Sequence, residues 1–223
     1  MEFTANQWAD VFTNLIAVII AVTLRAAAQA YTAKRFGDST AEQEGRLTLN
    51  PSSHIDAIGT ILIPVIGSFM GSGHFGWGRE IPRNERKLKN PDKDSILIAI
   101  SGPATHLICS FVFILLYIGA QYFFQIEFTS QTIGGAFSKL FITSAKVNAI
   151  LAFFNMIPLR PLDGAIVIEK ILPDNMLKAY EEYVVPNSMI LLLIILIGGS
   201  RVISGAAHSF LSIALSAALS LFQ

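Results

Sequence analysis

The sequence contains little charge and almost no cysteine. Asp, Glu, Lys and Arg make up only 14% of its 223 residues, and sixteen basic side chains balance sixteen acidic ones. A chain without excess positive charge lacks the electrostatic attraction that holds nucleic acid, so we expect no nucleic-acid partner. Cys109 is the one cysteine, which excludes an intrachain disulfide and a metal cluster built from several thiolates.

Apolar residues are correspondingly abundant. They make up 52% of the chain, and the mean hydropathy of +0.55 lies above that of ordinary soluble domains. A helix of about 20 apolar residues can cross a bilayer. Apolar stretches of that length occupy residues 11–33, 96–124, 132–158 and 188–222, the last being long enough for a helical hairpin. A fifth stretch, residues 55–71, is shorter and carries Pro64 near its centre.

The distribution of Lys and Arg predicts the topology. Residues 1–10 contain none, whereas the connections 34–54 and 72–95 contain several. Basic loops tend to stay in the cytoplasm, so the stretch between these two connections should enter the membrane and return on the same side. Residues 71–77 and 81–84 are expected to form short strands or turns. We predict a single all-α polytopic membrane domain over residues 1–223, with about five to six membrane segments, a short re-entrant or β-strand element, and an external N-terminus.

Ionisable side chains inside or beside the apolar stretches are candidate functional residues, because burying them in lipid is costly. Asp163 stands at the cytoplasmic end of the third stretch, as a functional carboxylate or as a turn residue beside Pro161. His54 and Asp56 stand where the fifth stretch begins and form either a site or a turn. His106 lies inside an otherwise uncharged span, where a histidine is either a metal ligand or a hydrogen-bonded packing residue.

Five segments, in their order and spacing, resemble the site-2 protease family of intramembrane zinc metalloproteases. They are residues 44–60 (EGRLTLNPSSHIDAIGT), 75–77 (FGW), 101–103 (SGP), 154–155 (FN) and 161–164 (PLDG). The resemblance is to the compact bacterial members that lack a PDZ domain, and it extends over nearly the whole chain. It implies a multi-pass protein of a bacterial cytoplasmic membrane, with zinc as the family's cofactor.

The family's central motif is His-Glu-x-x-His, whose two histidines ligate zinc while the glutamate activates the attacking water. The resemblance aligns this motif with Arg25-Ala-Ala-Ala-Gln29 in the present sequence. Both ligand positions, Arg25 and Gln29, and the general-base position, Ala26, are therefore degenerate. Asp163 matches the family's third ligand, but one carboxylate cannot hold zinc tightly. By the family's mechanism we expect no bound zinc and no proteolysis.

The loss of the motif leaves Asp163 without its cation and places Arg25 inside the membrane. A charge there is unstable unless it is paired. We therefore expect Arg25 and Asp163 to form a bidentate ion pair, supported by Gln29, that joins two helices where the family has its metal. In the alternative arrangement, Arg25 extends to the cytoplasmic face and Asp163 faces water.

The resulting functional hypothesis is a pseudoprotease that binds a membrane-protein client or an active protease relative without cleaving it. His54, Asp56, His106 and Asn155 are the residues expected to line the client groove or the former active site. One alternative is a zinc protease with a relocated site made of His54, His106 and Asp163, and another is a deliberately inactivated form of an active protease. Natural divergence is favoured, because His106 also departs from the Asn that the family usually has there. The remaining alternative is a structural or conductive role.

The expected partners beyond that client are lipids and a second copy of the chain. The protein should contact the bilayer along its apolar helices. The segment 204–222 mixes small residues with Leu and Phe, a composition that suits helix packing in membranes and therefore homo-oligomerisation.

Overall fold

The computed structural model describes residues 4–69, 74–124, 132–198 and 200–221, and every regular element in these ranges is helical. The longer helices are α1 (Ala5–Arg35), α3 (Ile63–Phe69), α4 (Pro91–Phe124), α5 (Ile133–Asn155), α6 (Asp163–Ile171), α8 (Ser188–Gly198) and α9 (Ser200–Leu219). The shorter helical turns are α2 (Thr40–Gln43), η1 (Pro51–Ser53), η2 (Ala57–Leu62), η3 (Glu85–Lys87), α7 (Asp174–Ala179), η4 (Tyr180–Val184) and η5 (Val185–Asn187). The prediction of an all-α polytopic fold is confirmed.

Four helices are long and apolar enough to cross a membrane: Ala5–Arg35, Pro91–Phe123, Ile133–Asn155 and Arg201–Leu219. The stretch predicted as a hairpin divides into α8 and α9. The 11 residues of α8 extend over only about 17 Å, whereas the hydrocarbon core is about 30 Å thick. The predicted number of five membrane segments is reached by counting either α8 or the short apolar helix Ala57–Phe69, and six is reached by counting both.

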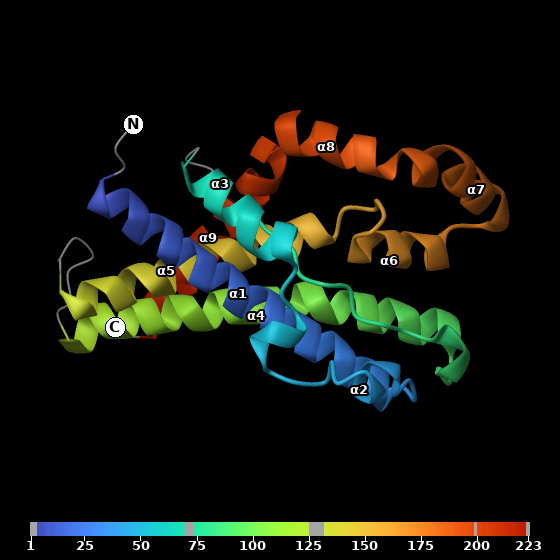
Figure 1. Cartoon of the computed structure of the whole chain (residues 1–223), viewed down its shortest axis with the longest axis horizontal. Helices are drawn as coiled ribbons and strands as arrows, with labels where there is room; N and C mark the ends of the chain where they lie inside the picture. The colour runs from blue at the N-terminus through green and yellow to red at the C-terminus, as the bar shows by residue number, and fades with distance from the viewer. Residues whose placement is uncertain (1–3, 70–73, 125–131, 199, 222–223) are drawn as a thin grey trace.

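The helices pack as a bundle around α1, α4 and α5 (Figure 1). Thr4 and Gln7 form a capping box that begins α1. Ala17 and Ala21 of α1 are fully buried against Leu151 of α5. Alanine allows two helix axes to approach closely, which lets van der Waals contact hold helices together in a solvent as apolar as their side chains. The long helices α4 and α5 run antiparallel, and α9 packs against both (Figure 1).

The predicted re-entrant element consists of η2 and α3, which follow one another over residues 57–69. Together they are about 20 Å long, too short to cross the bilayer. Residues 71–73 of the predicted strand or turn lie outside the described ranges, and beyond them the chain runs back beside the element. The N–H of Trp77 donates to the carbonyl of Gly59 (3.1 Å), and that of Arg79 donates to the carbonyl of His54 (2.9 Å). The chain therefore enters and leaves at one end, as a re-entrant element does.

The returning segment, residues 74–80, is extended and lies along α1. A Cβ atom on Gly76 would lie 2.9 Å from Val18, and one on Gly78 would lie 3.1 Å from Val22. Gly76 and Gly78, two residues apart, thus face Val18 and Val22, which are one turn apart on α1. The distance between alternate residues of an extended backbone is close to the rise of one helical turn. No strand ladder forms in the described part of the chain. Of the short strands or turns predicted at residues 71–77 and 81–84, the described residues 74–77 belong to a single extended segment, and residues 81–84 form no paired strand either.

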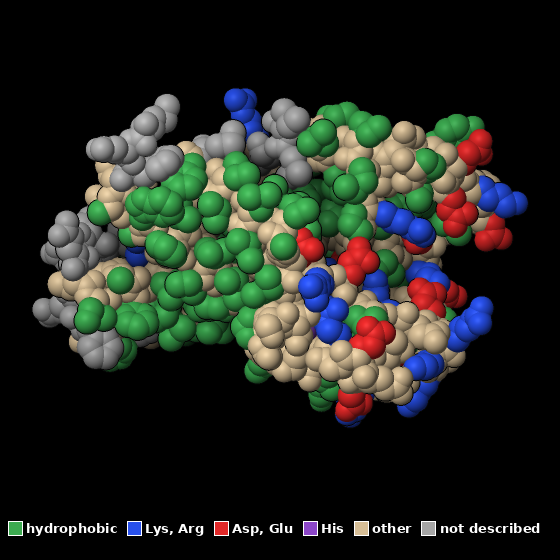
Figure 2. All heavy atoms as spheres, viewed as in Figure 1, with side chains coloured by type: hydrophobic (Ala, Val, Ile, Leu, Met, Phe, Trp, Pro, Cys, Tyr) green, Lys and Arg blue, Asp and Glu red, His purple; other side chains and the backbone are tan. Residues whose placement is uncertain are grey.

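Charged side chains gather at one end of the bundle. Figure 2 shows hydrophobic side chains over the half where α1 begins, and acidic and basic side chains over the half that holds α2, α6 and α7. Ion pairs at the charged end include Lys34 with Glu42 (2.6 Å) and Arg160 with Glu169 (2.6 Å). This separation of an apolar body from a charged end suits a protein that projects one end into water.

Candidate functional site

Two polar side chains of α1 lie one turn apart and near each other. Arg25 and Gln29 are four residues apart, the spacing of neighbours on a helix surface. The rotation of α1 is fixed by alanines of the same turns, since Ala26 and Ala30 are at most 2% exposed and pack with Ile81. Because Ala26 and Ala30 pack toward Ile81, the longer side chains of Arg25 and Gln29 can contact residues of α4 and α6.

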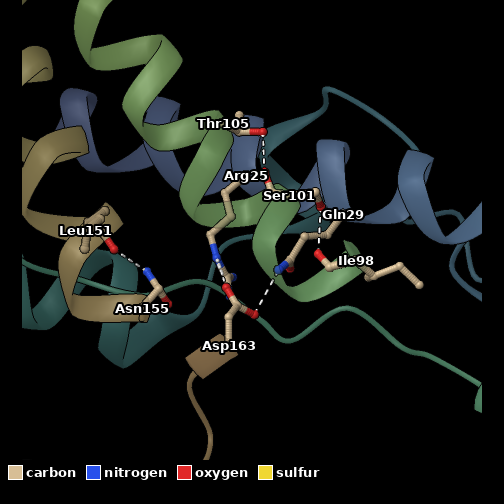
Figure 3. Close-up of polar contacts among 8 residues, drawn as sticks. All are labelled: Arg25, Gln29, Ile98, Ser101, Thr105, Leu151, Asn155 and Asp163. Atoms are coloured by element: carbon tan, nitrogen blue, oxygen red, sulfur yellow. Dashed lines mark hydrogen bonds and ion pairs between the residues drawn. The ribbon is translucent and has the colours of Figure 1, made fainter. Parts of the chain in front are cut away.

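Asp163 is the first residue of α6, and its side chain is only 4% exposed. The loop that leads to it from the end of α5 is tight. A Cβ atom on Gly164 would lie 2.2 Å from the carbonyl oxygen of Met156 and 2.5 Å from that of Ile157. Only glycine fits so close to two backbone carbonyls, so the start of α6 is pressed against the end of α5 and its carboxylate faces α1 (Figure 3).

Arg25, Gln29 and Asp163 meet at the centre of the site (Figure 3). Nη2 of Arg25 lies 2.6 Å from Oδ2 of Asp163, and Nε of Arg25 lies 3.2 Å from the same oxygen. Nε2 of Gln29 donates to the other oxygen, Oδ1, at 2.9 Å. The expected pairing of two donors with two oxygens is therefore altered: both guanidinium nitrogens share Oδ2, because Gln29 occupies Oδ1.

The pair is largely removed from water. The side chain of Arg25 is 15% exposed and that of Asp163 is 4% exposed. The two side chains thus meet inside the fold, in contrast to the alternative in which Arg25 extends to the aqueous face. A charge-assisted contact of this kind is stronger in a poorly hydrated site than at a surface, and breaking it leaves an uncompensated charge.

Gly102 of α4 forms the floor beneath this contact. A Cβ atom at this position would lie 2.7 Å from Nε2 of Gln29 and 3.0 Å from Oδ2 of Asp163. The neighbouring Ser101 and Thr105 donate to carbonyls of α4 itself, at 2.7 Å each (Figure 3). The backbone of α4 can therefore approach the polar side chains of α1 and α6 closely only because residue 102 has no side chain.

The donor set does not fit zinc. A catalytic zinc site needs three protein ligands from His, Cys, Asp or Glu, and of the three central side chains only Asp163 is such a ligand. Both of its oxygens already accept hydrogen bonds from Arg25 and Gln29, and the guanidinium would repel a second cation. Within the described ranges, no three His, Cys, Asp or Glu side chains gather as a metal-binding group.

The residues proposed for the relocated site have other partners. His54 is fully buried, and its Nε2 lies 2.8 Å from the carbonyl oxygen of Thr48. Burial lowers the pKa of His54, the hydrogen bond to Thr48 opposes this shift, and the nearby charge of Arg46 adds to it. His106 is also buried, with Nδ1 2.9 Å from Oδ1 of Asn148. His54, His106 and Asp163 are not brought together.

Asp56 and Asn155 make local hydrogen bonds. Oδ1 of Asp56 accepts from the backbone N–H groups of Ile58 (3.1 Å) and Gly59 (2.7 Å), so Asp56 caps the turn that begins the re-entrant element. Nδ2 of Asn155 donates to the carbonyl of Leu151 one turn back in α5 (2.8 Å; Figure 3). Asp56 thus has the turn geometry that was its alternative interpretation.

Two features of the site were not singled out as site residues from the sequence. Gly102 lies within the SGP segment, and its role could be found only from the close approach of α1 and α6. Phe75 stacks edge-to-face on Phe154, with ring centroids 4.5 Å apart, and joins the returning segment to the end of α5. Gly102 and Phe75 both lie in motif segments that carry the family resemblance. The motifs therefore indicated that these segments belong near the site, but not which residues Gly102 and Phe75 contact.

Comparison with known proteins gives two matches. A sequence model of peptidase family M50 matches residues 38–196, a range that includes Asp163 and begins after Arg25 and Gln29. A protein of Bacillus subtilis (strain 168), named "Putative zinc metalloprotease YwhC", is 41% identical over 160 residues, which cover 71% of this chain and 68% of that protein. No solved structure matches.

The ion pair leads to a prediction on stability. The variant Asp163→Ala leaves the guanidinium of Arg25 buried without a counter-charge, and we expect it to lower the free energy of unfolding by about 3 to 5 kcal/mol. The measurement is equilibrium unfolding in detergent micelles, followed by tryptophan fluorescence. The double variant Arg25→Met with Asp163→Leu should recover most of the loss, because it removes both charges and retains apolar volume.

The matched control is Asp174→Ala, which removes an exposed carboxylate at the start of α7 and should change stability by no more than about 0.5 kcal/mol. Equal stability of Asp163→Ala and the unmodified protein would contradict the proposed contribution of the pair.

Proposed function

Since this chain belongs to peptidase family M50, we propose that it keeps the membrane scaffold of these proteases and binds a membrane-protein segment without cleaving it. The observation that carries the proposal is the occupation of Asp163 by Arg25 and Gln29. The resemblance sets a cationic side chain and an amide at the positions where the family has two histidine ligands of zinc, which supports the proposal.

The site also lacks a base that could activate water. Ala26 lies next to Arg25, is 2% exposed and packs in an apolar cluster. A general base must lie within hydrogen-bond reach of the water that it deprotonates, and Asp163 is held by two donors. The absence of a metal-binding group and of a free carboxylate among the three central side chains supports the proposal that the chain does not hydrolyse its client.

The returning segment offers an edge for a client. The N–H groups of Trp77 and Arg79 point toward the re-entrant element, and in extended backbone the intervening residues direct their N–H and carbonyl groups to the opposite side. An extended peptide can add to such an edge through main-chain hydrogen bonds. We infer that a locally unwound transmembrane segment of a client lies along residues 76–80.

The end of α5 supplies the neighbouring wall. Phe75 ties the returning segment to Phe154, and Asn155 and Met156 follow directly in the sequence. Met156 is 40% exposed and begins the loop that leads to Asp163. A client bound on the extended edge would pass this loop, which makes Met156 a suitable reporter of occupancy.

The chain is proposed to lie in a bacterial cytoplasmic membrane with its N-terminus outside. The basic connections 34–54 and 72–95 support this orientation. The gathering of charged side chains over α2, α6 and α7 (Figure 2) supports it as well.

Restoring the family motif should convert the protein into a zinc protease. The triple variant Arg25→His, Ala26→Glu and Gln29→His, together with Asp163, regains three ligands and a base. We expect about one zinc ion per chain by elemental analysis and cleavage of a membrane peptide in detergent, whereas the unmodified protein should show neither.

The matched control for this experiment carries Gln in place of Glu at position 26 and should bind zinc without cleaving. If the unmodified protein purifies with stoichiometric zinc and cleaves the peptide, the binding-only proposal is wrong.

Client binding can be tested with a photocrosslinking amino acid in place of Met156. We expect a covalent adduct to the transmembrane segment of another membrane protein, identified by mass spectrometry of native membranes. The control position is Met189 on α8, which is 71% exposed and lies away from the site. The triple variant Arg25→His, Ala26→Glu and Gln29→His should cleave the captured protein within that segment, so the adduct should contain a shorter client. An adduct that forms equally at both positions would argue against a specific groove.

The orientation can be tested by cysteine labelling in a Cys109→Ser background. A membrane-impermeant maleimide should label the exposed position of Asn6→Cys in cells with a permeabilised outer layer and an intact inner membrane. Labelling of Arg86→Cys should require disruption of that membrane. The reverse pattern would place the N-terminus in the cytoplasm.

A further inference from the structure

The side chain of Arg46 lies against the backbone of Arg79, and neither arginine forms an ion pair in the described ranges. Nη2 of Arg46 is 3.4 Å from the carbonyl oxygen of Arg79, a long contact that satisfies little of the guanidinium. In the ranges that the structure describes, neither side chain has an acidic group within ion-pair distance. Nε of Arg46 is buried and has no acceptor there. Two neighbouring cations therefore present donors that the described side chains leave unused.

The two arginines are held by a rigid frame. The loop before the re-entrant element is fixed by the contact of His54 with the carbonyl of Thr48 (2.8 Å). The returning segment is fixed to the same turn by the bond from the N–H of Arg79 to His54 (2.9 Å) and by that from Oγ1 of Thr60 to the carbonyl of Trp77 (2.6 Å). The backbones that carry the two guanidinium groups are therefore positioned before any ligand binds.

The local electrostatics favour an anion at this place. Burial lowers the pKa of Arg46, and the like charge of Arg79 lowers it further, while Glu44 opposes the shift. The guanidinium nevertheless remains protonated near neutral pH. Since both side chains stay charged, their repulsion and the unused donors raise the free energy of the folded protein. A bound anion would offset both costs.

Exposed apolar side chains that are close to the two arginines in the sequence are typical of a bilayer surface. Leu49 is 66% exposed, Ile58 is 57% exposed and Trp77 is 40% exposed. Leu49 follows Thr48 in the loop after Arg46, Ile58 opens the re-entrant element, and Trp77 precedes Arg79 by two residues. Tryptophan is typical of the boundary between headgroups and hydrocarbon, and an arginine beside it can reach the phosphate layer.

We propose that Arg46 and Arg79 bind the phosphate of an anionic membrane lipid, whose acyl chains lie over the exposed apolar side chains of the re-entrant element. Guanidinium groups recognise phosphate through paired, charge-assisted hydrogen bonds. A soluble phosphate compound shares the headgroup chemistry, but it would make no use of the exposed apolar side chains of Leu49 and Ile58. The lipid would brace the loop and the returning segment that border the site.

The test measures lipid binding and does not depend on whether the chain cleaves anything. The full-length protein in an uncharged detergent is titrated with phosphatidylglycerol, and the midpoint of thermal unfolding is followed by tryptophan fluorescence. We expect a concentration-dependent rise that phosphatidylcholine does not give. The double variant Arg46→Gln with Arg79→Gln should bind at least about tenfold more weakly, because the charge-assisted contacts are lost.

The matched control is Arg83→Gln with Arg86→Gln, which removes the same charge from exposed positions of the connection that also holds Arg79. It should keep the full response, and an equal loss in both double variants would overturn the proposal in favour of diffuse charge attraction. A rise with inorganic phosphate as large as that with phosphatidylglycerol would overturn the assignment to a lipid. If the Arg46 variant fails to fold, Arg79→Gln alone, at an exposed residue, should show fewer retained lipids by native mass spectrometry. Unchanged retention would overturn the proposal.

Discussion

The contact of Asp163 with Arg25 and Gln29 determines how three helices meet at the centre of the protein. α6 packs against α4, and α1 packs against α4, whereas α1 and α6 share few backbone contacts of their own. The hydrogen bonds from Arg25 and Gln29 to Asp163 therefore link α1 directly to α6. The same contact requires a glycine at position 102, because α4 passes directly beneath it. The hydrogen bonds to Asp163, the close approach of α4 and the glycine at position 102 therefore depend on one another.

The convergence of residues 25, 29 and 163 could be predicted because the resemblance to the site-2 protease family sets all three at positions where that family has its metal ligands. Residues that align with the ligands of one ion must lie within a few ångströms of each other if the fold is retained. The detailed geometry could not be predicted, since it depends on which oxygen Gln29 occupies. The role of Gly102 was equally inaccessible, because a missing side chain gives no chemical signal until its neighbours are known.

The membrane helices followed from long apolar stretches, and the re-entrant element followed from basic residues on both of its sides. The last stretch was long enough for a helical hairpin, which agrees with its division into α8 and α9, but its length did not predict that α8 would have only 11 residues. His54 and His106 show a second limit. Their hydrogen-bond partners are Thr48, six residues away, and Asn148, 42 residues away, so only the folded chain could decide between packing and ligation.

The double occupation of Asp163 also bears on how such a chain can change with time. Replacing Arg25 by His alone would leave Asp163 with a single amide donor, and replacing Gln29 alone would leave Oδ1 without one, in a pocket where the carboxylate is 4% exposed. Neither step creates a metal site, because zinc needs further ligands, and each weakens the link between α1 and α6. Under the proposed function, every single-residue route toward hydrolysis therefore begins with a loss of stability and no gain in activity. A chain that carries this pair would therefore tend to keep it when substitutions arise one at a time.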